Sequence, residues 1–237
     1  MRIKPQISSS SIVAVGHFNP LILRPDWLLK KELIVGSDSE QMRVEVIHSE
    51  LVLLQFPWGR LHCDQGQFVV STDKDPIVTA YDFFVSCFQM LPETPVRAVG
   101  INREIHFPAG SAEKLHLIGD TLAPKQFWEE WTSEATGKRI GGLRSLVMEQ
   151  GVVREGRKIR KDGRAGYIQF KVEPSVRGDV PDGVFGSVNN HFDLTVKGEP
   201  NDGRAAAELV SEMWHDAIEQ AEHWFDHLMS IVDVDAN

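Results

Sequence analysis

Apolar and polar residues form two kinds of pattern along this chain. Short stretches that alternate between apolar and polar positions, or that are rich in β-branched residues, predict strands. These stretches are 12–18, 42–56, 67–72, 96–107, 142–148, 167–176 and 184–196. The stretch 42–56 is long enough for two strands that meet near residues 48–50.

Four other stretches are predicted to form helices. Residues 77–91 are apolar nearly all round, which predicts a helix buried against the sheet. Residues 204–232 have apolar positions every three or four residues, which predicts a long amphipathic final helix. At about 1.5 Å per residue this helix would span about 42 Å, so part of it is expected to extend past its own core. Short helices are predicted at 25–34 and 124–134.

Two pairs of phrases are similar in the two parts of the chain. LQF at 54–56 leads to FVVSTD at 68–73, and IQF at 168–170 leads to VFGSVNN at 184–190, with a helical stretch after each. We therefore predict an α+β fold with two related β-rich units, antiparallel strands, a buried central helix and a long C-terminal amphipathic helix. The units would be pseudo-repeated halves, about 1–135 and 136–237, of a single compact domain.

Composition is that of an ordinary globular protein, with 42% hydrophobic and 25% charged residues in 237. Two cysteines, Cys63 and Cys87, are too few for a disulfide framework, and no secretory signal pattern is present. The apolar stretch 77–91 is shorter than the roughly 20 residues that cross a membrane. We expect reduced thiols, a cytoplasmic location and no membrane partner.

Charge is divided unevenly along the chain. Residues 1–137 carry a net charge of −5, residues 138–177 carry +7 and residues 178–237 carry −11. The cationic stretch predicts a binding surface for phosphate, nucleic acid or an acidic partner. The six candidate residues are Arg154, Arg157, Lys158, Arg160, Lys161 and Arg164. The same residues could instead form a solvated hairpin tip, or neutralise the acidic final helix of the same molecule.

Four tryptophans lie in the last two predicted helices, at Trp128, Trp131, Trp214 and Trp224. Tryptophan is enriched at the energetic centres of protein interfaces, so we expect these residues to form an interface. Packing in the core is the alternative for each of them.

Histidine precedes phenylalanine three times, at His17, His106 and His191, each near the end of a predicted strand. If the phenylalanines face the core, the three imidazoles face outward, and three converging imidazoles can hold Zn²⁺ with one open position. Three unrelated surface histidines are the alternative.

Other chemical motifs are weak. His62, Cys63 and Asp64 are adjacent on an extended chain, so their side chains point apart and cannot form a nucleophilic relay. The glycines of TGKRIGG at 136–142 lack the order of a phosphate-binding loop. We expect no catalytic residues and no cofactor.

These observations favour a non-enzymatic cytoplasmic interaction protein, a subunit or adaptor. It would self-associate as a homo-oligomer, or dock a partner protein, through the final helix and the basic connection, residues 154–164. The alternatives are nucleic-acid binding through the basic segment 138–164 and a metal-dependent hydrolase with a histidine-based site.

Overall fold

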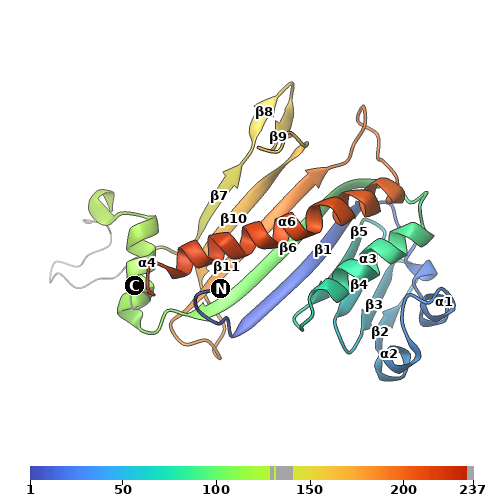
Figure 1. Cartoon of the computed structure of the whole chain (residues 1–237), viewed down its shortest axis with the longest axis horizontal. Helices are drawn as coiled ribbons and strands as arrows, with labels where there is room; N and C mark the ends of the chain where they lie inside the picture. The colour runs from blue at the N-terminus through green and yellow to red at the C-terminus, as the bar shows by residue number, and fades with distance from the viewer. Residues whose placement is uncertain (129–130, 132–140, 234–237) are drawn as a thin grey trace.

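Nine antiparallel strands form one sheet in the computed structural model, which describes residues 1–128, 131 and 141–233 (Figure 1). Their order across the sheet is β2-β3-β4-β5-β1-β6-β11-β10-β7. The strands are β1 (Ile7–Gly16), β2 (Arg43–Ile47), β3 (Leu51–Gln55), β4 (Arg60–Asp64), β5 (Gln67–Thr72), β6 (Val96–Pro108), β7 (Leu146–Gln150), β10 (Gly166–Pro174) and β11 (Gly183–Asp193). The predicted α+β class with antiparallel strands is confirmed.

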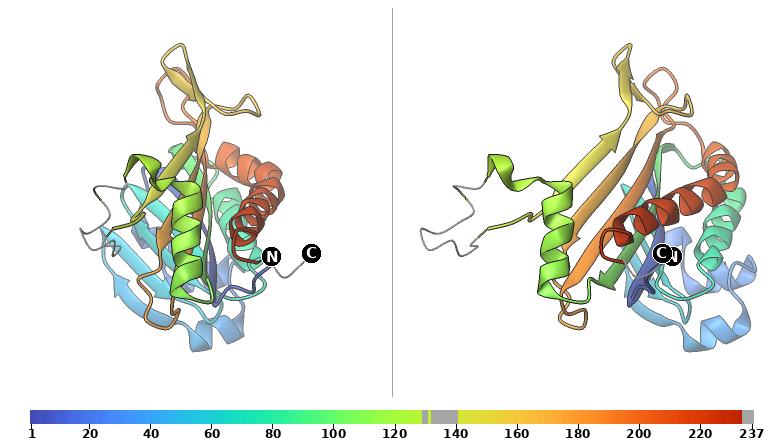
Figure 2. Two further views of the ribbon diagram at one scale, coloured as in Figure 1. Left: turned by 90° about the vertical axis from the view of Figure 1, so that its left-hand side faces the viewer. Right: turned by 60° about the vertical axis from the view of Figure 1, so that its left-hand side comes forward.

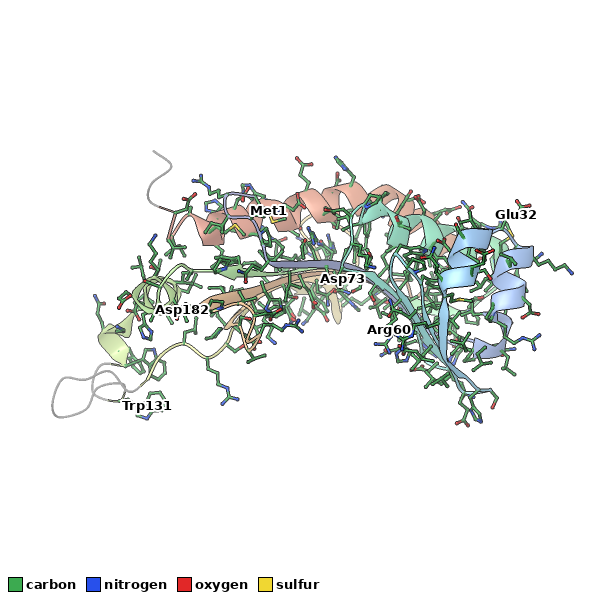
Figure 3. The ribbon with its side chains drawn as sticks, turned by 90° about the horizontal axis from the view of Figure 1, so that it is seen from below. Met1, Glu32, Arg60, Asp73, Trp131 and Asp182 are labelled. Atoms are coloured by element: carbon green, nitrogen blue, oxygen red, sulfur yellow. The ribbon has the colours of Figure 1, made fainter. Side chains whose placement is uncertain are left out.

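Two long helices, α3 (Val78–Met90) and α6 (Gly203–Met229), pack side by side on one face of this sheet (Figure 3). The predicted buried central helix and long final helix are therefore confirmed. The shorter elements are η1 (Pro20–Ile22), α1 (Pro25–Lys30), α2 (Gly36–Gln41), α4 (Ala112–Leu122) and η2 (Lys125–Phe127).

Helix α6 begins at a side-chain cap and is buried along its length. The carboxylate of Asp202 accepts a hydrogen bond from the backbone N–H of Ala205 at 2.8 Å, which satisfies a free donor at the helix start. Buried side chains recur from Ala206 to Met229, against the expectation that part of the helix extends past its core. The helix is long because it spans both hydrophobic clusters of the protein, one around α3 and one around β10 and β11.

The strands on the two sides of the central β1–β6 pair occupy corresponding positions. Outward from β1 the neighbours are β5, β4 and β3, and outward from β6 they are β11, β10 and β7. Along the chain, the two sets run β1-β3-β4-β5-α3 and β6-β7-β10-β11-α6. Strand β2 is additional to the first set.

The repeated phrases match these positions only in part. FVVST lies in β5 and VFGSV in β11, which occupy corresponding places. LQF, however, begins in β3 and IQF lies in β10, which do not correspond. The division into pseudo-repeated halves stays a prediction, and its boundary at 135/136 lies outside the described residues.

Some short elements were not predicted. Strand β4 follows the tight turn at 57–59, and a hairpin of β8 (Val152–Arg154) and β9 (Arg157–Ile159) projects beyond the sheet in the basic connection (Figure 2). Helix α4 is capped by Ser111, whose hydroxyl accepts a hydrogen bond from the N–H of Lys114. Of the predicted helix 124–134, η2 covers three residues, and residues 129–130 and 132–134 lie outside the described residues.

Candidate docking surface

Three aromatic side chains lie on the surface just beyond α4. Phe127, Trp128 and Trp131 are 82%, 47% and 76% exposed. The Phe127 and Trp128 ring centres are 4.7 Å apart, and those of Trp128 and Trp131 are 6.2 Å apart. Figure 3 shows Trp131 at one extremity of the molecule, at the opposite end from Glu32. We call these three residues the aromatic cluster.

Local contacts hold the aromatic cluster in place. The ammonium group of Lys125 lies 2.6 Å from the carboxylate of Asp120, which ties η2 to the end of α4. The N–H of Trp131 donates to the carbonyl of Trp128 at 3.0 Å. Single exposed apolar residues are common on protein surfaces, whereas contiguous exposed aromatic rings are less usual and are a feature of interaction sites in general.

An apolar groove opens where the sheet meets α6 and the end of α4. Its volume is about 550 Å³, and its lining includes Leu122, Leu146, Met148, Phe170, Trp224 and Ile231. Trp224 is 45% exposed, with its ring centre 6.4 Å from that of Phe170. Leu122 is the last residue of α4, so the groove and the aromatic cluster lie at the two ends of one short connection.

The predicted interface tryptophans therefore have different positions. Trp128, Trp131 and Trp224 are exposed, whereas Trp214 is 9% exposed and lies in the core between α6 and α3. Its ring centre is 5.5 Å from that of Tyr81. Trp214 is a packing residue because it belongs to the apolar side of α6 that faces the sheet. The same packing buries most of the apolar side of the final helix, whereas Trp224 of that helix stays exposed in the groove.

The predicted basic surface is mostly paired within the molecule. Arg157 lies 2.9 Å from Asp193, Lys158 lies 2.6 Å from Glu149, and Arg164 pairs with Glu212 of α6. Among the described residues, Arg154 and Lys161 form no ion pair. These pairs reduce the positive charge available to a phosphate, and they agree with the alternative in which the segment neutralises acidic groups of its own molecule.

The hydrogen bonds of this segment also shift the pKa of its acidic partner. Burial acts to raise the pKa of Asp193, but hydrogen bonds from Thr195 and Arg157 outweigh it and lower the pKa.

Residues 138–140 of the predicted nucleic-acid segment lie outside the described residues. Nucleic-acid binding stays a prediction.

Arg160 is buried rather than exposed to solvent. It is 4% exposed, its Nε donates to Asp162 at 2.9 Å, and one Nη donates to the Asn190 side-chain oxygen at 3.1 Å. A buried guanidinium needs such partners, because an unpaired charge away from water is costly. Arg160 therefore anchors the loop after β9 to the sheet and is turned away from external ligands.

The three histidines of the predicted metal site do not meet. His106 is opposite Ile7 at the start of β1, whereas His17 follows the end of β1, about 30 Å away at about 3.3 Å per residue. His191 is opposite Gly100, between these levels. Strand register separates them because each His-Phe dipeptide lies at a different position along its strand.

Each histidine has local partners instead. His106 Nδ1 lies 2.8 Å from the Ser175 hydroxyl, and His191 stacks on Tyr167 with ring centres 4.6 Å apart. Burial lowers the pKa of both imidazoles. Within 1–128, 131 and 141–233, no group of three or more His, Cys, Asp or Glu side chains is placed to hold a metal ion.

A row of polar residues crosses the sheet on the face opposite α3 and α6, and the sequence patterns did not indicate it. Each residue of the row is the direct cross-strand partner of the next, so all share one face. In spatial order they are Arg43, Gln55, Arg60, Ser71, Ser11, Asn102, Asn189, Gln169 and Glu149. The side-chain amide of Asn102 donates to Ser11 at 3.2 Å. The row is visible only once the register is known.

Comparison with known proteins gives no family. No protein-family model matches this chain, and no curated protein sequence matches it. One similar solved structure is that of a rolling circle replication initiator protein from Geobacillus stearothermophilus, at 10% identity and a TM-score of 0.31. The similarity covers 89% of this chain and 79% of that chain and supports no inference about function. No helix of the described residues is long and apolar enough to cross a membrane.

Proposed function

We propose that this protein is a non-enzymatic interaction protein that docks a partner protein through the aromatic cluster. The observation that carries the proposal is the exposure of Phe127 and Trp131, at 82% and 76%. Both rings are large enough to enter an apolar pocket of a partner. Aromatic side chains are efficient anchors because they bury much area for few rotatable bonds.

The groove beside the aromatic cluster extends the same surface. Its lining is mainly apolar, and Met148 and Trp224 are 58% and 45% exposed. A partner that covers the aromatic cluster is expected to reach the groove, because only residues 123–126 separate Leu122 of the groove from Phe127 of the cluster. A partner segment with apolar side chains fits this groove, since most of the lining is apolar and a charged segment would lose hydration there.

Site-specific photocrosslinking in cells of the source organism tests this proposal. A photoreactive phenylalanine analogue replaces Trp131 in one variant and Val176 in the control, because Val176 is 96% exposed and lies in the loop after β10. We expect one crosslinked protein that appears from position 131 and is absent from position 176. The same crosslinked protein from both positions, or none from position 131, would contradict the proposal.

A second variant distinguishes specific docking from non-specific adhesion of an exposed ring. This variant carries the photoreactive analogue at Phe127 together with Trp131→Ser, and it is compared with a chain that carries only the analogue at Phe127. Removal of an interface anchor typically costs about 2 kcal/mol or more, so crosslinking at subsaturating concentration should fall by about tenfold or more. An unchanged yield would show that Trp131 contributes nothing to the contact.

A further inference from the structure

The sheet ends at an edge strand whose exposed side chains are largely apolar. Strand β7 pairs with β10 on one side, and the chain then continues into β8. Four apolar side chains of this run are exposed, Val147 at 48%, Met148 at 58%, Val152 at 54% and Val153 at 71%. Proteins commonly protect such edges with charges, prolines or bulges, because free backbone N–H and C=O groups pair readily with another strand.

The opposite edge of the same sheet carries this protection. Strand β2 has a register shift between Val44 and Val46, the mark of a β-bulge. The extra residue, Glu45, forms an ion pair with Arg60 at 2.7 Å. Both edges expose apolar side chains, Val44 at 50% and Ile47 at 40% on β2, but β7 pairs with β10 without a register shift.

Residues 146–154 are self-complementary when two copies of the run are placed antiparallel with Gln150 opposite itself. Val147 is then opposite Val153 of the partner subunit, on one face of the seam. Met148 is opposite Val152 of the partner subunit, on the other face. Exposed apolar side chains thus meet one another, which stabilises cross-strand pairs.

Charges also fit this register. Glu149 is opposite Gly151 of the partner subunit. It retains its ion pair with Lys158 of its own chain, at 2.6 Å. Arg154 is opposite Leu146 of the partner subunit. Like charges are therefore not placed directly opposite one another, which would be destabilising.

We infer that a second copy of this chain pairs antiparallel along 146–154, so that the two sheets continue across a twofold axis at Gln150. This contact does not include the aromatic cluster, but it shares Met148 and Gln150 with the lining of the groove. It uses the isologous geometry of twofold dimers, in which one patch contacts the same patch of the partner.

Cysteine crosslinking tests the register. In the variant Gln150→Cys, each new thiol meets its own copy, because directly opposite Cα atoms in antiparallel strands lie about 4.5–5.5 Å apart, within the reach of a disulfide. The native cysteines, Cys63 and Cys87, are buried and do not compete. Val147→Cys is the matched control, since position 147 would be opposite position 153 and not itself.

We expect Gln150→Cys to form a disulfide-linked dimer at least tenfold faster than Val147→Cys under mild oxidation. The double variant Val147→Cys with Val153→Cys should crosslink as fast as Gln150→Cys. Equal rates for the two single variants would overturn the proposed register.

Sedimentation velocity on the unmodified protein tests the dimer itself without any new cysteine. We expect a dimer that dissociates on dilution, and a monomer at the same concentration for Val153→Glu, which would place two carboxylates at the seam. Trp131→Ser should leave the dimer unchanged, so failure of this inference and failure of the docking proposal are distinguishable. A strict monomer at about 100 µM would overturn the inference.

Discussion

The guanidinium carbon of Arg160 lies 4.1 Å from the centre of the Phe192 ring, and both side chains are buried. The cation faces the ring, while Asp162 and Asn190 accept its hydrogen bonds. Replacement of Arg160 by Met would leave both oxygens without their donor. We expect a loss of about 3 kcal/mol in the free energy of unfolding, measured by urea denaturation.

Arg154→Met is the control for this experiment, because Arg154 is exposed and forms no ion pair with the described residues. Its effect should stay within about 0.5 kcal/mol. Equal effects of the two substitutions would show that Arg160 is not an anchor.

Gly166 has a backbone conformation and surroundings that exclude a side chain. Its φ is +134°, and a Cβ there would lie 2.1 Å from the carbonyl oxygen of His191 on the neighbouring strand. Gly166→Ala should therefore lower the free energy of unfolding by about 3 kcal/mol. In Gly178→Ala, where nothing lies within 4 Å of the added Cβ, thermal stability should barely change. Similar melting temperatures for the two variants would contradict this account of Gly166.

Stability should fall as the pH is lowered through the histidine range. Burial holds the pKa of His191 in the folded protein below the unfolded value of about 6.5. The unfolded chain then binds the proton more readily, so the contribution to stability is present above about pH 6.5 and is lost as pH falls through the folded pKa. Melting temperature should drop between pH 7.5 and 5.5.

The variant His191→Gln should show a smaller drop over the same pH interval. His106, whose pKa is also lowered by burial, accounts for part of the remainder. Asp193 does not interfere, because hydrogen bonds lower its pKa and so move its titration further from the histidine range. An NMR titration that gave His191 a folded pKa above 6.5 would contradict the prediction.

Both cysteines should be inert in the folded protein. Burial raises the pKa of Cys63 to about 12 and raises that of Cys87 as well. Because the thiolate is the reactive form, a thiol reagent at pH 8 should label neither residue on the time scale in which it labels a free thiol. Two thiols per chain should react after unfolding in guanidinium. Rapid labelling of the native protein would show that one of these residues is accessible.

The longest helices were predictable from residue patterns, whereas α4 and several short elements were not. Helices α3 and α6 follow from many repeated apolar positions, and β5 was predicted with its observed bounds. Strands β4, β8 and β9 have five residues or fewer and directly adjoin turns, so their patterns are not distinguished from a turn, whereas β2 and β3, also of five residues, lie in one long predicted stretch. For the same reason residue patterns alone do not predict the β8–β9 hairpin within the basic connection.

The exposure of the candidate site residues depends on three-dimensional contacts that residue patterns do not reveal. Trp131 and Trp214 are the same residue type in helical patterns, yet one is exposed and the other is packed against Tyr81. Arg154 and Arg160 lie six residues apart in one basic stretch, and only the fold buries Arg160. The polar row is likewise set by strand register. The cytoplasmic location and the identity of a partner stay predictions.

The docking function is tested most directly by calorimetry with the partner protein, which is the protein crosslinked from position 131. The dissociation constant of this partner is measured for the native chain and for Trp131→Ser. Since loss of an interface anchor costs about 2 kcal/mol or more, the variant should bind about 30-fold more weakly or worse. Equal dissociation constants would contradict the claim that the aromatic cluster is the docking surface.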